Sequence, residues 1–515
     1  MKRIQNIEFY PFLFAVYPTL ALLGQNIEEI KPVVAVRAFL ITLLVIAVCF
    51  GVLAWLLKDR SKAAVVSTLG ALLFFSYGHI YNGVKQISTV ATLLGRHRIL
   101  APVWLVLFVL GVIWIIRFKR DFRSWTPGLN LVVVVVLVLP LAQIGLYQFR
   151  ELATNSLAPA VSKDVTGLHL PQDQPAPDIY YIILDAYGRD DVLEEMYALD
   201  NTAFLKHLAD MGFYITRCSR SNYTQTQLSL ASSLNFDYIQ NLGEYISGQT
   251  TRVGLDKMIH HSAVRQALKQ LGYRMVAFET GFKYTQVEDA DLYLFPHNSL
   301  LEGVSLSGGL NGFEVMLVNT SAGRLLTDAV NVLPGSIKPV WEYPEQAHRE
   351  LVLFDLEQLR QLPESPGQKF IFAHIVAPHP PYVFEADGSF SPPDKPDFSG
   401  YRDQVLYLNN QMETLLAEII QSSTTPPIII IQADHGPILA APRQRLKILN
   451  AYYLPGSGAE RLYPTITPVN TFRLVFDAYF GGQYGLLDDT SYFSTYQDPY
   501  EYITEPDDRP GCEGQ

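Results

Sequence analysis

The feature that most constrains this chain is a series of five long stretches without a charged residue, all within the first 150 residues. Each is 18 to 26 residues long, and they cover 9–27, 38–57, 63–84, 99–116 and 124–149. A helix rises about 1.5 Å per residue and the hydrocarbon core of a bilayer is about 30 Å thick, so about 20 apolar residues are enough to cross it. The first stretch is the weakest because Pro11 and Pro18 lie inside it, and a re-entrant or cleaved segment is the alternative there. The series predicts a transmembrane domain of about five helices in residues 1–150 rather than a buried helical bundle.

The short loops between these stretches predict the orientation of the chain. Nine basic residues fall on the side of the N-terminus and five on the other side. Because the side richer in Lys and Arg stays in the cytoplasm, the N-terminus is predicted to be cytoplasmic. After an odd number of spans, everything beyond Arg150 is then extracytoplasmic, as expected for an integral plasma (inner) membrane protein.

The rest of the chain has the opposite charge. Residues 1–150 carry a net charge of +10, and residues 151–515 carry −21. An acidic part of this size argues against nucleic acid as a partner, since phosphate backbones are held mainly by Lys and Arg. The three cysteines are too few for a disulfide framework, and their spacing fits no zinc ribbon or finger.

Three short apolar runs beyond residue 177 have the length of strands and are apolar on both faces. They are Ile179–Leu184, Phe370–Ala377 and Pro427–Gln432. Continuous apolar runs are typical of buried parallel strands, and helical patterns lie between them. We therefore predict a Pro-rich linker at 151–177, followed by an α/β domain with a mixed, mostly parallel sheet at 178–482. Residues 483–515 are predicted to form a C-terminal extension or a poorly ordered tail.

Polar residues directly follow the three predicted strands: Asp185 the first, His379 the second, and Asp434 and His435 the third. In open α/β sheets, ligands bind at the carboxyl ends of the strands. A fourth contribution is Thr224, in a polar stretch that leads into a predicted helix at 228–234. A helix N-terminus carries partial positive charge, which suits both an activated hydroxyl and the phosphate or sulfate that it attacks.

Two carboxylates and an imidazole, with a hydroxyl as fourth ligand, suit a divalent metal ion, and a metal-bound Thr oxygen becomes an alkoxide far more readily than a free one. Taken singly, Asp185 fits a turn cap, Thr224 an ordinary N-cap, and residues 434–436 a surface turn equally well. Their joint placement at one sheet edge favours the metal site. Thr226, two residues away, is the alternative nucleophile.

Together these residues resemble the alkaline phosphatase superfamily, in its sulfatase-like branch. The resemblance rests on Leu184-Asp185 after a strand, a Thr that opens a helix, Ala377-Pro378-His379-Pro380-Pro381-Tyr382 and Asp434-His435-Gly436. Closest in layout are the membrane-anchored lipoteichoic acid synthases and lipid A phosphoethanolamine transferases, which also place five helices before an extracytoplasmic catalytic domain. The resemblance extends from the first helix to about Gly482.

The resemblance implies a role for each residue. Asp185, Asp434 and His435 would bind one divalent metal ion (Mn²⁺, Zn²⁺ or Mg²⁺), Thr224 would be both ligand and nucleophile, and His379 would contact the transferred group or the leaving oxygen. Sulfatases need a Cys or Ser, followed by Pro and Arg, that is oxidised to formylglycine. Residues 224–228 offer none of these, so sulfate ester hydrolysis is disfavoured. The phosphotransferases commonly have Glu where Asp185 stands, which leaves the branch open.

The predicted function is membrane-anchored, metal-dependent transfer of a phosphorus-containing head group from a lipid donor to a cell-envelope acceptor, through a covalent intermediate on Thr224. With water as acceptor the same site is a phosphodiesterase or phosphatase. A non-catalytic envelope scaffold is the alternative of a different class. His374 is predicted to be an internal strand residue, and the basic residues at 443–447 either meet an anionic substrate or form a solvated patch.

Overall fold

The computed structural model divides the chain into two compact units. It describes residues 7–87, 95–119, 121–157, 167–170, 175–242, 251–296, 310–331, 344–391 and 395–506. Unit 1 consists of Met1–Phe149 and Asn298–Pro344, and unit 2 of Arg150–His297 and Glu345–Gln515. The second stretch of unit 1 therefore interrupts the sequence of unit 2. Of the predicted linker, 158–166 and 171–174 lie outside the described residues, as does the end of the predicted extension, 507–515.

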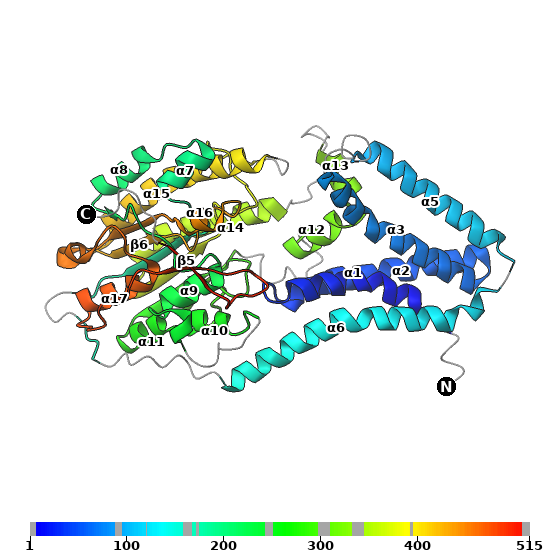
Figure 1. Ribbon diagram of the computed structural model, residues 1–515, viewed down its shortest axis with the longest axis horizontal. Coiled ribbons are helices and arrows are strands. Elements are labelled where there is room, and N and C mark those ends of the chain that lie inside the picture. The colour runs from blue at the N-terminus through cyan, green and yellow to red at the C-terminus, as the bar shows by residue number, and fades with distance from the viewer. Residues whose placement is uncertain are drawn as a thin grey trace. The chain divides into compact units, whose positions relative to one another are not determined.

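The described part of unit 1 is helical (Figure 1). Its helices are α1 (Tyr10–Asn26), α2 (Val36–Leu57), α3 (Arg60–Gln86), α5 (His97–Arg117), α6 (Thr126–Leu157), α12 (Gly312–Asn319) and α13 (Arg324–Asn331). Four described stretches are long and apolar enough to cross a membrane: Pro32–Leu57, Arg60–Lys85, His97–Arg117 and Thr126–Leu152. Helix α1, at 17 residues, is shorter, so its crossing of the membrane stays a prediction.

Many apolar side chains of these helices face outward. Trp55 is 77% exposed, and Leu44 and Leu131 are each 65% exposed. So much exposed apolar surface is stable in lipid rather than in water. Unit 1 is therefore a multi-pass membrane domain, as the sequence predicts, and not a bundle buried within a soluble protein.

Polar contacts attach the inserted stretch, 298–344, to the helices of unit 1. Arg37 of α2 and Glu314 of α12 form a two-pronged ion pair, with Nε 2.6 Å from Oε1, and their side chains are only 8% and 5% exposed. His97 Nε2 of α5 lies 2.5 Å from Asp328 Oδ2 of α13. The backbone N–H of Ala322 also donates to Phe74 O over 2.7 Å. Residues more than 200 positions apart in the sequence thus form one packed unit.

A seven-stranded sheet forms the centre of the described part of unit 2, in the order β2-β7-β6-β1-β5-β3-β4. Strands β6, β1, β5, β3 and β4 run parallel, and β7 and β2 continue the sheet with antiparallel pairing. The bounds are β1 (Ile179–Leu184), β2 (Tyr214–Ile215), β3 (Arg274–Phe278), β4 (Leu292–Leu294), β5 (Lys369–Ile375), β6 (Ile428–Gln432) and β7 (Asn450–Tyr453). The prediction of a mixed, mostly parallel α/β sheet is confirmed.

Helices cover both faces of this sheet (Figure 1). Tyr181 and Ile183 of β1 point to one core, and Tyr180 and Ile182 point to the other, because successive strand residues face opposite sides. On the first side lie α9 (Thr226–Leu234), α10 (Leu255–His260), α11 (Ala263–Gln270) and α17 (Pro468–Tyr479). On the second lie α7 (Asp190–Tyr197), α8 (Thr202–Asp210), α14 (Pro344–Gln361) and α15 (Asp397–Ser422).

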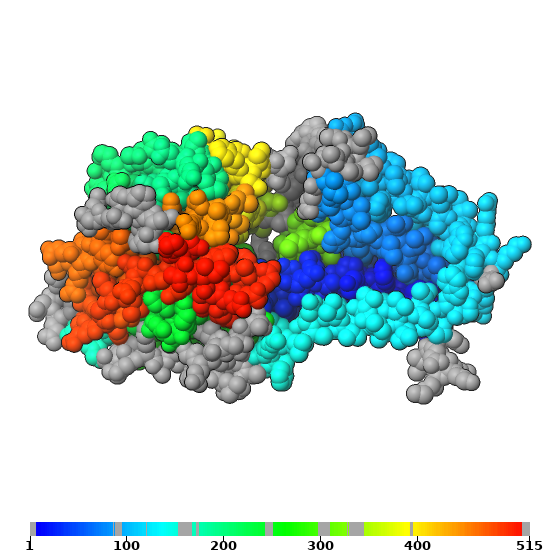
Figure 2. Space-filling model, in the orientation of Figure 1, coloured from blue at the N-terminus to red at the C-terminus, as the bar shows by residue number. Residues whose placement is uncertain are grey.

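Unit 2 has two further features. Helix α16 (Pro442–Leu446) follows β6, and the strands β8 (Ser491–Phe493) and β9 (Ile503–Glu505) form a separate antiparallel pair. The C-terminal residues therefore have defined structure as far as Pro506, and they lie on the surface of unit 2 (red in Figure 2).

Candidate functional site

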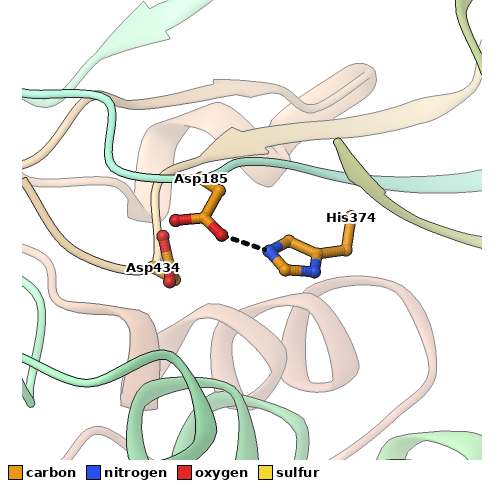
Figure 3. A group of neighbouring side chains, drawn as sticks. All are labelled: Asp185, His374 and Asp434. Atoms are coloured by element: carbon orange, nitrogen blue, oxygen red, sulfur yellow. Dashed lines mark ion pairs between the residues drawn. The ribbon is translucent and has the colours of Figure 1, made fainter. Parts of the chain in front are cut away.

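Three neighbouring parallel strands bring two carboxylates and an imidazole together at the carboxyl edge of the sheet. Asp185 follows β1, His374 lies near the end of β5, and Asp434 follows β6. One ligand atom from each lies within 4.8 Å of the other two. Figure 3 shows the three side chains converging, with Asp185 Oδ2 at 3.2 Å from His374 Nε2. The parallel register causes this meeting, since Ile183 pairs with His374 and with Gln432.

His435 adjoins the same group. Its Nε2 lies 3.4 Å from Asp434 Oδ2 and 3.8 Å from Asp185 Oδ1. Its Nδ1 lies 2.8 Å from the carbonyl oxygen of Gly436, to which it donates. That hydrogen bond leaves the Nε2 lone pair available for a metal ion or a proton.

The donor atoms fit a divalent cation. Asp185 and Asp434 are each 1% exposed, and Asp185 Oδ1 and Asp434 Oδ2 have no hydrogen-bond donor among the described residues. His374 is also 1% exposed; among the described residues its Nδ1 has no hydrogen-bond partner, and its Nε2 faces only Asp185 Oδ2. Buried polar atoms are costly to leave unpaired, and one cation could bind one ligand atom from each of the three side chains.

The protonation states agree with this fit. Burial raises the pKa of Asp185, but the imidazoles of His379, His374 and His435 outweigh burial and hold that pKa well below its ordinary value. Burial lowers the pKa of His435, against the opposing charge of Asp434. An ionised carboxylate and a neutral imidazole are the forms that bind metal ions.

The segment that carries the threonines borders this group. Helix α9 begins at Thr226, with Gln225 as its N-cap residue, so Thr224 lies just outside the helix. The Thr224 side chain is 2% exposed, and its Oγ1 has no hydrogen-bond partner among the described residues. Thr226 Oγ1 lies 3.3 Å from His435 Nε2. The geometry therefore keeps both hydroxyls as candidate nucleophiles.

His379 sits beside Asp185 on the segment after β5. Its backbone N–H donates to Asp185 O over 3.1 Å, and its Nδ1 lies 2.6 Å from Pro380 O. The side chain is partly exposed, and its ring packs against Phe282 at 6.4 Å between ring centres. Nδ1 is thus engaged by the backbone, and Nε2 is the nitrogen that can meet a substrate.

The sequence pattern did not reveal the position of the His374 side chain in the candidate site. It is an internal strand residue, as predicted, but its side chain faces Asp185 rather than apolar neighbours. The available signal was its register, one residue before the end of a buried parallel strand. Of the three basic residues at 443–447, Arg445 reaches the candidate metal site, with its Nη2 3.3 Å from His435 Nε2. Arg443 pairs with Glu505, and Lys447 with Asp191.

Comparisons with known proteins place the chain in a family. The family model described as Sulfatase matches residues 177–473, which is more than half of the chain. No curated protein matches the chain. Eight similar solved structures share 10–13% identity with it at TM-scores below 0.5, so they carry no conclusion about its activity.

Three of these structures show how similar the solved structures are to this chain. The integral membrane lipooligosaccharide phosphoethanolamine transferase A (EptA) of Neisseria meningitidis is 13% identical, with 93% of this chain and 95% of that chain covered and a TM-score of 0.37. The C-terminal periplasmic domain of EptC from Escherichia coli, in a complex with Zn, is 11% identical (64% and 92% covered, TM-score 0.41). The lipoteichoic acid synthase LtaP of Listeria monocytogenes is 12% identical (66% and 85% covered, TM-score 0.39). The Sulfatase model covers more than half of the chain, and the chain therefore belongs to the sulfatase family.

Proposed function

We propose that this enzyme is a membrane-anchored, metal-dependent transferase that moves a phosphorus-containing head group from a lipid donor to a cell-envelope acceptor, with Thr224 as the nucleophile. The observation that carries the proposal is that the Thr224 hydroxyl is buried and has no hydrogen-bond partner among the described residues, on a segment whose Thr226 reaches His435 beside the buried group of Asp185, His374 and Asp434. Unit 1 supplies the membrane helices that would keep the lipid within reach.

In this proposal Asp185, Asp434 and His435 hold one divalent cation together with the Thr224 hydroxyl, and His374 lies beside them. Such a cation lowers the pKa of a bound hydroxyl and offsets negative charge on a phosphoryl group. Mn²⁺, Zn²⁺ and Mg²⁺ are the candidate ions.

The chemistry divides into two displacements at phosphorus. Thr224 Oγ loses its proton and forms a bond to phosphorus while the bond from phosphorus to the lipid oxygen breaks, and that oxygen takes up a proton. His379, with Nε2 directed away from its own backbone contact, stabilises or protonates the departing oxygen. A hydroxyl of the acceptor then loses its proton and forms a bond to phosphorus, the bond from phosphorus to Thr224 Oγ breaks, and Thr224 Oγ regains a proton. Arg445, beside His435, supplies positive charge near the phosphoryl oxygens.

The second candidate is a hydrolase, in which water replaces the acceptor hydroxyl. Because Thr224 has no path to formylglycine, sulfate ester hydrolysis is the less favoured form of this candidate. We place the N-terminus in the cytoplasm and unit 2 outside it, from the excess of basic residues in the loops.

The test is a head-group release assay with the full-length enzyme in proteoliposomes that contain phosphatidylethanolamine or phosphatidylglycerol. The proposal predicts diacylglycerol formation that needs a divalent cation, is abolished in Thr224→Ala and survives in Thr226→Val. Head group found on an added sugar acceptor supports the transferase, and head group found free in solution supports the hydrolase. Release that survives in Thr224→Ala but not in Thr226→Val would move the nucleophile to Thr226.

A further inference from the structure

The C-terminal strap, as we name residues 488–506, runs along the segment that carries Thr224. The backbone N–H of Tyr492 donates to Asn222 O over 2.8 Å, and Tyr223 and Tyr492 form a parallel β-bridge. The rings of Tyr223 and Tyr492 also stack, with centres 5.7 Å apart. The strap thus fixes the backbone on the N-terminal side of Thr224. Further hydrogen bonds join Ser491 Oγ to Ser221 O, Asn222 Nδ2 to Thr490 O, and Arg220 Nη1 to Pro506 O.

Gln225 fixes the other side. It stands between Thr224 and Thr226 and is 1% exposed. Its Nε2 lies 3.2 Å from Ser494 O, 3.1 Å from Ser494 Oγ and 3.1 Å from Thr495 O. The two hydrogens of one amide are therefore shared among three acceptors, all of them on the strap.

The strap also reaches the imidazole side of the site. Arg445 Nη2 donates to Tyr496 Oη over 3.4 Å, and the same nitrogen lies 3.3 Å from His435 Nε2. Arg252 lies over the Tyr496 ring, at 4.9 Å from its centre. One segment therefore contacts both the residues around the hydroxyl and the arginine beside the metal-binding group.

We propose that the C-terminal strap is a positioning element for the Thr224 hydroxyl, and that Gln225 is the positioning residue through which it acts. This inference rests on the proposed function, in which Thr224 attacks phosphorus. Thr is β-branched, so few χ1 rotamers are open to it and the direction of Oγ follows the backbone. A reacting group misplaced by about 1 Å loses on the order of 10²-fold in rate. The strap therefore controls kcat rather than the affinity for the lipid.

The test compares Gln225→Met and Gln225→Glu with Glu505→Gln in the full-length enzyme, with phosphatidylethanolamine or phosphatidylglycerol, whichever the wild type uses. Gln225→Met removes the three contacts at nearly constant volume, and Gln225→Glu turns a carboxylate toward three oxygens. Both are expected to lower kcat by about 10- to 100-fold with KM within about threefold of wild type. Glu505→Gln removes only the charge from the pair with Arg443, whose side chain is 54% exposed, and is expected to keep kcat.

Hydrogen exchange provides the readout that does not depend on turnover. Residues 221–226 are expected to exchange faster in Gln225→Met than in wild type, and not in Glu505→Gln. If Gln225→Met does not fold, Ser494→Ala, which removes one of the three acceptors, takes its place and should lower kcat a few-fold. Equal kcat and equal exchange in wild type and the folded variants would overturn the inference. A wild type that releases no head group would overturn the proposed function instead, while the exchange result would still decide the role of the strap.

Discussion

Breaking the buried ion pair between Arg37 and Glu314 should destabilise unit 1 strongly. The two side chains are 8% and 5% exposed, and they join α2 to a helix from a stretch 277 residues further along the chain. Removing one partner of a buried pair leaves an uncompensated charge and costs about 3–5 kcal/mol. Glu314→Gln is the cleanest change, because Glu314 also accepts the Asn311 N–H in a capping box and glutamine keeps that acceptor.

The assay is equilibrium unfolding in mild detergent, followed by intrinsic tryptophan fluorescence. All five tryptophans fall within unit 1, so the signal reports on the unit that contains the pair. The matched control is the double variant Arg37→Met with Glu314→Gln, which removes both charges and should recover most of the lost stability, because no unpaired charge remains. The reasoning would be refuted if the free energy of unfolding of Glu314→Gln were within about 1 kcal/mol of wild type, or if the double variant were less stable than Glu314→Gln.

Three further changes test the site. Asp434→Asn removes the carboxylate charge beside His435 but keeps an acceptor oxygen for the Ala186 N–H. We therefore expect a folded protein that retains little metal by elemental analysis. Full metal content would contradict the ligand role of Asp434. His374→Gln should weaken metal retention by about 10- to 100-fold in a chelator competition, whether His374 binds the ion or orients Asp185, and unchanged retention would make it a packing residue. Burial, aided by the charge of His379, lowers the pKa of His348 to about 4. Between pH 6.5 and about 4, the His348 side chain therefore binds a proton in the unfolded chain but not in the folded chain. Stability should therefore fall as pH falls through that window, and His348→Gln should flatten the decline of the calorimetric melting temperature; an equally steep decline would assign it to other groups.

Much of unit 2 could be predicted from the sequence because its strands are unbroken apolar runs. Ile179–Leu184 and the four isoleucines before Gln432 have one reasonable structure, a buried parallel strand, and the parallel edge then brings Asp185 and Asp434 together. The role of His374 could not be predicted in the same way. The side chain of a polar residue inside an apolar strand can lie on either face of the sheet. Only the pairing of β5 with β1 brings His374 next to Asp185.

Two other features depend on contacts between distant residues that leave no local pattern. The stretch 298–344 joins the membrane helices through single ion pairs, such as Arg37–Glu314, and through backbone contacts such as that of Ala322 with Phe74. The C-terminal strap holds the Thr224 segment largely through backbone carbonyls, which every residue possesses. Composition rich in Tyr, Asp and Pro predicts an extension or a tail there, but it carries no information about what the segment contacts.

The most direct test of the central claim is mass spectrometry of enzyme quenched during turnover on its lipid donor. Trypsin releases residues 221–252 as one peptide that contains both Thr224 and Thr226, and fragmentation assigns a modification to one of them. The account predicts an adduct on Thr224, with the mass of phosphoethanolamine or glycerol phosphate, that is missing from Thr224→Ala. An adduct on Thr226, or an unmodified peptide from metal-loaded enzyme even under conditions that block the second displacement, would contradict it.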